Sequence, residues 1–169
     1  RRNALIRLLE RLIDQDAARV LVPAYASEPG YWFGGGNLVQ DSDGVVWLCG
    51  RYRNYGDSRT GLAAGTRGLE VAIFRSDDGG GSFRKVRSWS KPDLTSPYGK
   101  IISYEGTALH RNADGGWELY ISSEKERSYP APLEEFQKPG TGFWSIDMLT
   151  GPTPEAIEGP DLAPVLVND

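Results

Sequence analysis

The first residues of the chain have a helical pattern of hydrophobic and charged positions. In "NALIRLLERLIDQ", residues 3–15, leucine and isoleucine recur every three or four positions with charged residues between them. That spacing predicts an amphipathic helix, which we place within residues 1–16. We expect its apolar side to pack on the rest of the chain, and binding to a partner protein is the alternative.

After residue 17 the hydrophobic pattern changes to short alternating runs. The segments "GNLVQ" and "VVWLCGRYR" flank the turn "DSDG", and "LEVAIFR" and "FRKVRSW" flank "SDDGGGS". Alternating runs of this length around Asp- and Gly-rich turns are typical of β-hairpins. Together they predict a four-stranded antiparallel meander over residues 36–89.

A similar order of strands and turns returns later in the chain. The segments "GTALHR" and "WELYISSE" flank "NADGG", "GFWSIDML" follows, and the unit spans about residues 106–150. Setting Gly36 against Gly106 gives an offset of 70 residues (106 − 36 = 70), and a one-residue insertion sets a Trp, a Leu and an Asp-Gly turn in corresponding places. A repeated four-stranded sheet is the unit of a β-propeller, so the sequence predicts an all-β, partial propeller domain over residues 17–169.

The propeller interpretation predicts that the chain is a piece of a larger protein. Closed propellers have roughly 4–8 blades, and this chain has room for about two, as expected of part of a five- or six-bladed ring. We interpret the final "PVLVND" as the start of a further blade. The chain begins with Arg1 and Arg2 rather than Met, and a secreted or periplasmic parent is the expectation if that parent carried a signal peptide.

Composition and charge narrow the classes of partner. The net charge of −4 offers no basic field for nucleic acid, and no apolar run approaches the length of a membrane span. One cysteine and one histidine give no set of zinc ligands, so we expect neither a metal nor another cofactor.

The second hairpin turn has a recognisable spacing. Ser76, Asp78, Gly80 and Phe83 follow the pattern S-x-D-x-G-x-x-F, with a hydroxyl at Ser82. This resembles the Asp-box of sialidases and related propellers. The resemblance implies a structural turn between the third and fourth strands of a blade, with the phenylalanine packed between blades. A phosphate-binding loop and a calcium loop are the alternatives, but the first needs a following helix and the second more carboxylates.

The position of this turn predicts where a functional site lies. In a four-stranded meander the first and third turns share one end, so the long connections 51–68, 89–104 and 124–141 gather at the other end. Long loops on a rigid scaffold are where binding and catalytic residues concentrate. We therefore expect the site at the end opposite the Asp-box-like turn.

One glutamate at that end suggests hydrolytic chemistry. Glu105, in "SYEGTALHR", resembles the Glu-Gly-Pro stretch that carries the general acid in five-bladed arabinanase and xylosidase-type glycosidases, with Thr107 in place of the proline. The resemblance implies glycoside hydrolysis with Glu105 as the acid. A second carboxylate has to face it, and Asp57 and Asp93 are the candidates. A loop cap or an ion pair with arginine is the alternative role for Glu105.

The remaining candidates are contacts to a carbohydrate. Arg51 and Arg53 lie on one face of a strand and can bind a carboxylate or pair with acidic loops. Trp32 can stack on a sugar or pack internally, Asn37 can donate a hydrogen bond, and Glu124 ends a strand at the same end. The predicted function is hydrolysis of a terminal glycosidic bond, sialidase-like or arabinanase/xylosidase-like. The alternative is a non-catalytic Asp-box propeller that binds glycan or protein.

Overall fold

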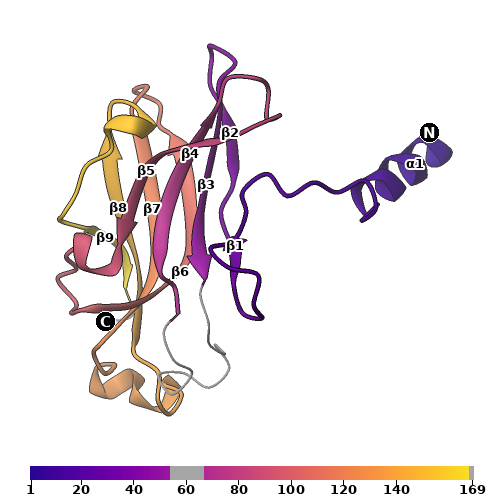
Figure 1. Ribbon diagram of the computed structural model, residues 1–169. Coiled ribbons are helices and arrows are strands. Elements are labelled where there is room, and N and C mark those ends of the chain that lie inside the picture. Colours follow the sequence, from indigo (N-terminus) through magenta and orange to yellow (C-terminus); the bar gives the residue numbers. More distant parts are fainter. Residues whose placement is uncertain (54–66, 168–169) are drawn as a thin grey trace.

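The computed structural model describes residues 1–53 and 67–167 as two antiparallel sheets and an N-terminal helix (Figure 1). The helix is α1 (Arg2–Leu12). The first sheet contains β1 (Trp32–Gly34), β2 (Leu38–Gln40), β3 (Val46–Arg53), β4 (Glu70–Ser76) and β5 (Arg84–Ser90). The second contains β6 (Ile101–Arg111), β7 (Trp117–Lys125), β8 (Phe143–Gly151) and β9 (Ala163–Val167). Short 3-10 helices η2 (Lys91–Asp93), η3 (Ala131–Phe136) and η4 (Pro154–Ala156) lie in the connections.

The predicted meander of the first sheet is confirmed. Strand β2 pairs with β3, β3 with β4 and β4 with β5, all antiparallel. A further strand, β1, pairs with the second half of β3, with Trp32 opposite Arg53. The all-β prediction is therefore confirmed as two antiparallel sheets with a short helix. The described residues do not form a closed ring of sheets.

The second sheet is also a four-stranded meander, in the order β6-β7-β8-β9. The C-terminal residues that the sequence assigned to a further blade form β9, which pairs antiparallel with β8. The connection before β9 buries Ile157 and Leu162 in the core between the sheets. That burial brings the chain back alongside β8, so β9 completes the second sheet.

The two sheets pack face to face around one apolar layer. Its buried side chains include Trp47, Cys49, Val71 and Ile73 from the first sheet and Trp117, Leu119, Ile121 and Leu149 from the second. The rings of Trp47 and Trp117 meet edge to face across the layer, with centroids 6.1 Å apart. Main-chain hydrogen bonds also cross it, including one of 2.8 Å from Thr107 N to Gly35 O.

The first hairpin turns of the two sheets have the same hydrogen bonds, which determines the offset of the repeat at the turn. Asp41 N donates to Val45 O in the first sheet, and Asn112 N donates to Gly116 O in the second. Equivalent turn positions are therefore 71 residues apart (112 − 41 = 71), as the one-residue insertion allowed, but this register does not make Trp47 and Trp117 equivalent. In a strand, a shift of one residue transfers each side chain to the opposite face of the sheet.

The offset of 71 residues shows which faces of the two sheets pack against each other. Trp117 is equivalent to Val46, and Trp47 is equivalent to Glu118. The two indoles therefore project from opposite faces of equivalent sheets, and they meet because the front of one sheet packs on the back of the next. We call this head-to-tail packing, as opposed to a two-fold arrangement in which equivalent faces meet.

Residues from the N-terminal segment cover the outer face of the first sheet. Tyr52, Ala72 and Phe74 form a second cluster there, and Val22 packs against it. The ring of Tyr25 stacks on that of Tyr52 with centroids 4.1 Å apart.

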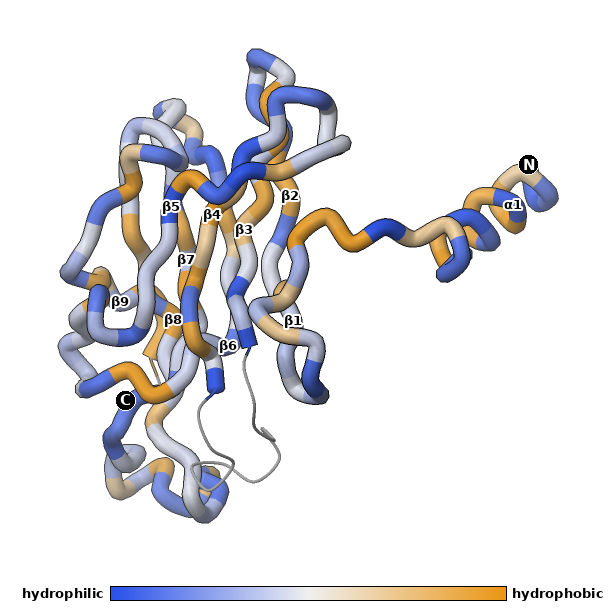
Figure 2. The backbone as a smooth tube through the Cα atoms, viewed as in Figure 1, coloured by the Kyte–Doolittle hydropathy of each residue, from blue (hydrophilic) through white to orange (hydrophobic). Residues whose placement is uncertain are grey.

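Helix α1 lies apart from both sheets. It projects away from them in Figure 1, and none of its residues is buried. Figure 2 shows its hydrophobic positions interleaved with hydrophilic ones, and Leu5, Leu8, Leu9 and Leu12 are all exposed. The predicted helix is present, but it does not pack on the sheets as expected. Within residues 1–53 and 67–167, no helix has the length and apolar character needed to span a bilayer.

Candidate functional site

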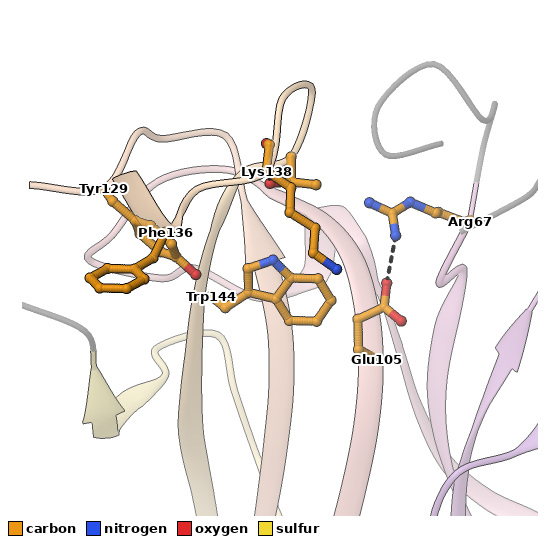
Figure 3. Close-up of a pocket in the computed structure, with 7 residues that line it drawn as sticks. Arg67, Glu105, Tyr129, Phe136, Lys138 and Trp144 are labelled. Atoms are coloured by element: carbon orange, nitrogen blue, oxygen red, sulfur yellow. Dashed lines mark hydrogen bonds and ion pairs between the residues drawn. The ribbon is translucent and has the colours of Figure 1, made fainter. Parts of the chain in front are cut away.

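A pocket of about 470 Å³ opens at the end of the second sheet where the long connections lie (Figure 3). The described residues that line it are Arg67, Glu105, Tyr129, Phe136, Lys138, Thr141 and Trp144. Aromatic rings from the β7–β8 connection and the start of β8 form one wall. Arg67 and Glu105 lie opposite them, and Lys138 extends from the β7–β8 connection alongside Trp144, as Figure 3 shows.

A β-bulge presents Glu105 to this pocket. Tyr104 pairs with Ser123 and Gly106 pairs with Ser122, so Glu105 is an extra residue of β6 with no partner on β7. Bulges change the direction of a side chain, and they are frequent beside functional sites. The bulge buries Tyr104 in the core while the next side chain reaches the pocket.

Two arginines hold the Glu105 carboxylate. Arg67 Nη1 lies 3.1 Å from Glu105 Oε1, and Arg51 Nη2 lies 3.4 Å from Oε2. The hydroxyl of Ser103 donates a third contact of 2.5 Å to Oε1. Arg67 and Ser103 donate hydrogen bonds to Glu105 and Arg51 forms an ion pair with it, so in this arrangement the carboxylate is a hydrogen-bond acceptor. A general acid has to donate a proton, and this geometry fits a base, a nucleophile or a ligand acceptor better.

Arg67 is a functional candidate that sequence reasoning missed, as are the aromatic lining residues Tyr129 and Trp144. It is buried directly before β4, where Gly68 follows with φ +54°. A Cβ atom at Gly68 would lie 2.3 Å from Ser103 Oγ and from Tyr104 N. Only glycine lets the chain pass this close to β6, and that approach brings Arg67 to Glu105. The Arg-Gly pair before a strand was the available signal, but it does not reveal which strand lies alongside.

Glu124 lies behind Arg67 rather than at the pocket surface. Its side chain is fully buried, pairs with Arg67 Nη2 and accepts a hydrogen bond of 2.5 Å from Gly142 N. Glu124 was predicted to contact substrate, but its carboxylate instead binds these two partners inside the protein, as a buried carboxylate requires.

The other predicted substrate contacts form a separate group beside the pocket. The Arg51 guanidinium lies 4.6 Å from the ring centroid of Trp32, and its Nε donates to Glu105 O at 2.5 Å. Burial lowers the pKa of Arg51 from its usual value, although the charge of Glu105 acts in the opposite direction. Arg53 pairs in register with Trp32 across β1 and β3. None of these three side chains is among the described residues that line the pocket.

The remaining predicted polar candidates have structural partners or lie outside the described residues. Asn37 Nδ2 donates to Leu109 O at 3.0 Å, and Leu109 N donates to Asn37 Oδ1 at 2.8 Å. Asp93 caps η2 by accepting hydrogen bonds from the main chain and hydroxyl of Ser90, which lower its pKa. Its carboxylate is engaged there and does not line the pocket. Asp57 lies outside the described residues.

The Asp-box-like turn lies at the opposite end of the sheets from the pocket (Figure 1). Asp78 accepts hydrogen bonds from the hydroxyl of Ser76 (2.6 Å) and from the main chain and hydroxyl of Ser82. Gly80 N donates to Ser76 Oγ, and Gly80 has φ +93°. Phe83 packs on the outer-face cluster of the first sheet rather than between the two sheets. These contacts give the turn a structural role.

A buried ion pair underlies the pocket end of the second sheet. Lys125 Nζ lies 2.6 Å from Asp147 Oδ2, and both side chains are fully buried. Ser145 also accepts a hydrogen bond from Lys125. Burial lowers the pKa of Lys125, although the interactions with Asp147 act in the opposite direction.

No group of three or more His, Cys, Asp or Glu side chains that can hold a metal ion occurs in the described part of the chain. No protein-family model matches the sequence, and no similar curated protein is found. The functional inference therefore depends on the chemistry of the pocket.

Proposed function

We propose that the pocket binds a carbohydrate. Its volume falls in the range of about 300–1,000 Å³ that is usual for ligand sites. Sugar rings have an apolar C–H face that packs on aromatic rings and hydroxyls that pair with charged groups. Trp144 and Tyr129 offer the first surface, and Glu105 and Arg67 offer the second. This opposition of an aromatic wall and a charged wall carries the proposal.

We further propose that the bound sugar is hydrolysed at a terminal glycosidic bond. Glu105 is the carboxylate among the described lining residues, so it is the group that contacts the reacting bond. Its arginine partners favour a role as base or nucleophile rather than the general acid expected from the resemblance. Hydrolysis also requires a second carboxyl group. Of the two that the sequence suggested, Asp93 is engaged by Ser90 and Asp57 lies outside the described residues.

A second candidate function is sugar binding without catalysis. The ion pairs of Glu105 with Arg51 and Arg67 favour it, because they occupy the carboxylate in the absence of ligand. The aromatic wall suits sugar hydrolysis and sugar binding equally well, so a measurement of hydrolytic activity is needed to distinguish the two functions.

We propose that the two sheets are neighbouring blades of a sialidase-like β-propeller. Head-to-tail packing of equivalent meanders supports this, because rotation about a common axis repeats the same interface from blade to blade. The first strand of the second sheet, β6, lies against β2 and β3, the first two strands of the other meander, which is compatible with neighbouring blades. The hydrogen-bonded turn at Asp78 supports the same resemblance.

A panel of 4-nitrophenyl glycosides tests both levels of the proposal. Binding is measured by ligand-observed NMR, and hydrolysis by release of nitrophenolate, for the wild type and for Trp144→Ala and Glu105→Gln. We expect the first variant to weaken binding about tenfold and the second to lower turnover at least about 100-fold. Glu155→Gln, at the other end of the sheets, is the matched control. Binding without turnover supports the non-catalytic function, and a wild type that binds no glycoside overturns both.

A further inference from the structure

Arg67 connects two glutamates from neighbouring strands. Its Nη1 contacts Glu105 of β6 at 3.1 Å, and its Nη2 pairs with Glu124 of β7. The Arg67 side chain is 6% exposed, and it lines the pocket together with Glu105 (Figure 3). One guanidinium group thus spans a buried carboxylate and the carboxylate of the pocket.

The buried end of this connection is fixed. Glu124 is 0% exposed and accepts a second hydrogen bond from Gly142 N. A Cβ atom at Gly142 would lie 2.0 Å from Lys125 O, so the main chain that donates this bond is tightly packed. Glu124 therefore has little freedom to move with Arg67.

The main chain around Arg67 is fixed as well. Lys91 Nζ donates to Arg67 O at 3.2 Å, and Tyr104 N donates to Gly68 O at 3.2 Å. Because the main chain at Arg67 and the Nη2 atom are both held, the planar guanidinium has little freedom to rotate, and its remaining N–H groups point in fixed directions. The Nη1 group donates its hydrogen bond to Glu105 Oε1.

We propose that Arg67 is a positioning residue of the pocket, which orients the Glu105 carboxylate toward the ligand with Glu124 as its buried anchor. The inference rests on the proposed binding of a sugar. Lysine retains the charge but has no planar fork with which to bridge two carboxylates, so charge alone does not replace Arg67.

A double-mutant cycle tests the proposal with the 4-nitrophenyl glycoside that the wild type binds best. The dissociation constant is measured for the wild type, Arg67→Lys, Glu105→Gln and the double variant. If Arg67 acts through Glu105, Arg67→Lys weakens binding about tenfold in the wild type and less than about twofold in Glu105→Gln. Equal losses in both backgrounds indicate a merely structural role and overturn the proposal.

Two further variants make the cycle decisive. Glu124→Gln removes the anchor charge and is expected to weaken binding several-fold, whereas Arg84→Lys, an exposed arginine paired with Glu155 at the other end, leaves it unchanged. Thermal unfolding tests whether each variant is folded. If Arg67→Lys fails to fold because Glu124 is left unpaired, the cycle uses Arg67→Lys combined with Glu124→Gln. A wild type that binds no glycoside overturns sugar binding itself, whereas retained binding with equal losses overturns only the role of Arg67.

Discussion

Asn37 and Leu109 join the two sheets through a reciprocal pair of hydrogen bonds, in which the Asn37 side chain donates to and accepts from the Leu109 main chain. Replacing Asn37 by Ala leaves a donor and an acceptor unsatisfied in the layer between the sheets. We expect Asn37→Ala to lower the free energy of unfolding by about 1–3 kcal/mol, measured by urea denaturation. Asn3→Ala, on the exposed helix α1, is the control. Weaker sugar binding with unchanged stability would contradict the structural role.

Gly68 allows the close approach of Arg67 to β6. We expect Gly68→Ala to destabilise the protein by more than about 2 kcal/mol, because positive φ and the 2.3 Å contacts of the new Cβ both oppose it. Gly44→Ala separates the two causes, since Gly44 has φ +83° but open space around its Cβ. That control is expected to lose only about 1–2 kcal/mol. Equal losses in urea denaturation would show that the contact with β6 is unimportant.

Asp78 makes the stability of the second hairpin turn depend on pH. Hydrogen bonds from the hydroxyls of Ser76 and Ser82 hold the pKa of Asp78 well below its ordinary value of 3.8. Because the folded-state pKa is depressed, the stabilisation is fully present above the unfolded-state pKa and is lost as pH falls toward the folded-state value. We expect the difference in melting temperature between the wild type and Asp78→Asn to be largest near neutral pH and to shrink below about pH 4.

Asp77→Asn is the matched control for that titration. Asp77 is more than half exposed and pairs with Arg75 on the surface, where ion pairs contribute little. A pH profile of Asp78→Asn that runs parallel to that of the wild type would refute the assignment.

For the buried pair of Lys125 and Asp147, we expect the loss of stability to depend on whether one charge or both charges are removed. Lys125→Met leaves a buried carboxylate without its cation, and we expect a loss of about 3–5 kcal/mol in urea denaturation. The double variant Lys125→Met, Asp147→Leu removes both charges and is expected to recover most of that loss. A double variant no more stable than the single one would show that packing, rather than charge, sets the cost.

The N-terminal residues divide into a part that contributes to stability and a part that does not. Removing residues 1–16 is expected to leave the unfolding midpoint unchanged, because α1 buries no side chain. Removing residues 1–25 is expected to lower it, because Tyr25 stacks on Tyr52 and hydrogen-bonds to Glu70. Thermal unfolding of the two truncated proteins makes the comparison, and a lower midpoint for the shorter deletion would show that α1 packs on the sheets after all.

The strands and tight turns could be predicted from the sequence because their causes are local. Alternation of apolar residues determines a strand, and Asp-Gly pairs determine a turn within a few residues. Glu105 could be singled out because the short stretch around it resembles a known motif, although the structure places it inside β6 rather than before a strand. A local pattern also identified the turn at Asp78, whose partners Ser76 and Ser82 lie within four residues of it.

Side-chain partners across the fold depended on tertiary structure. A single-residue difference in the repeat decides whether Trp47 and Trp117 face each other, and hairpin hydrogen bonds rather than composition determine that register. Asn37 is engaged by Leu109, 72 residues away, and Glu124 by Arg67, 57 residues away. The sequence by itself determined most of the strands, although not β1, and it suggested the loop-rich end as the place for a site. The bulge at Glu105 and the close passage of Gly68 decided which charges meet there, because such contacts depend on packing between segments that the chain brings together only when it folds.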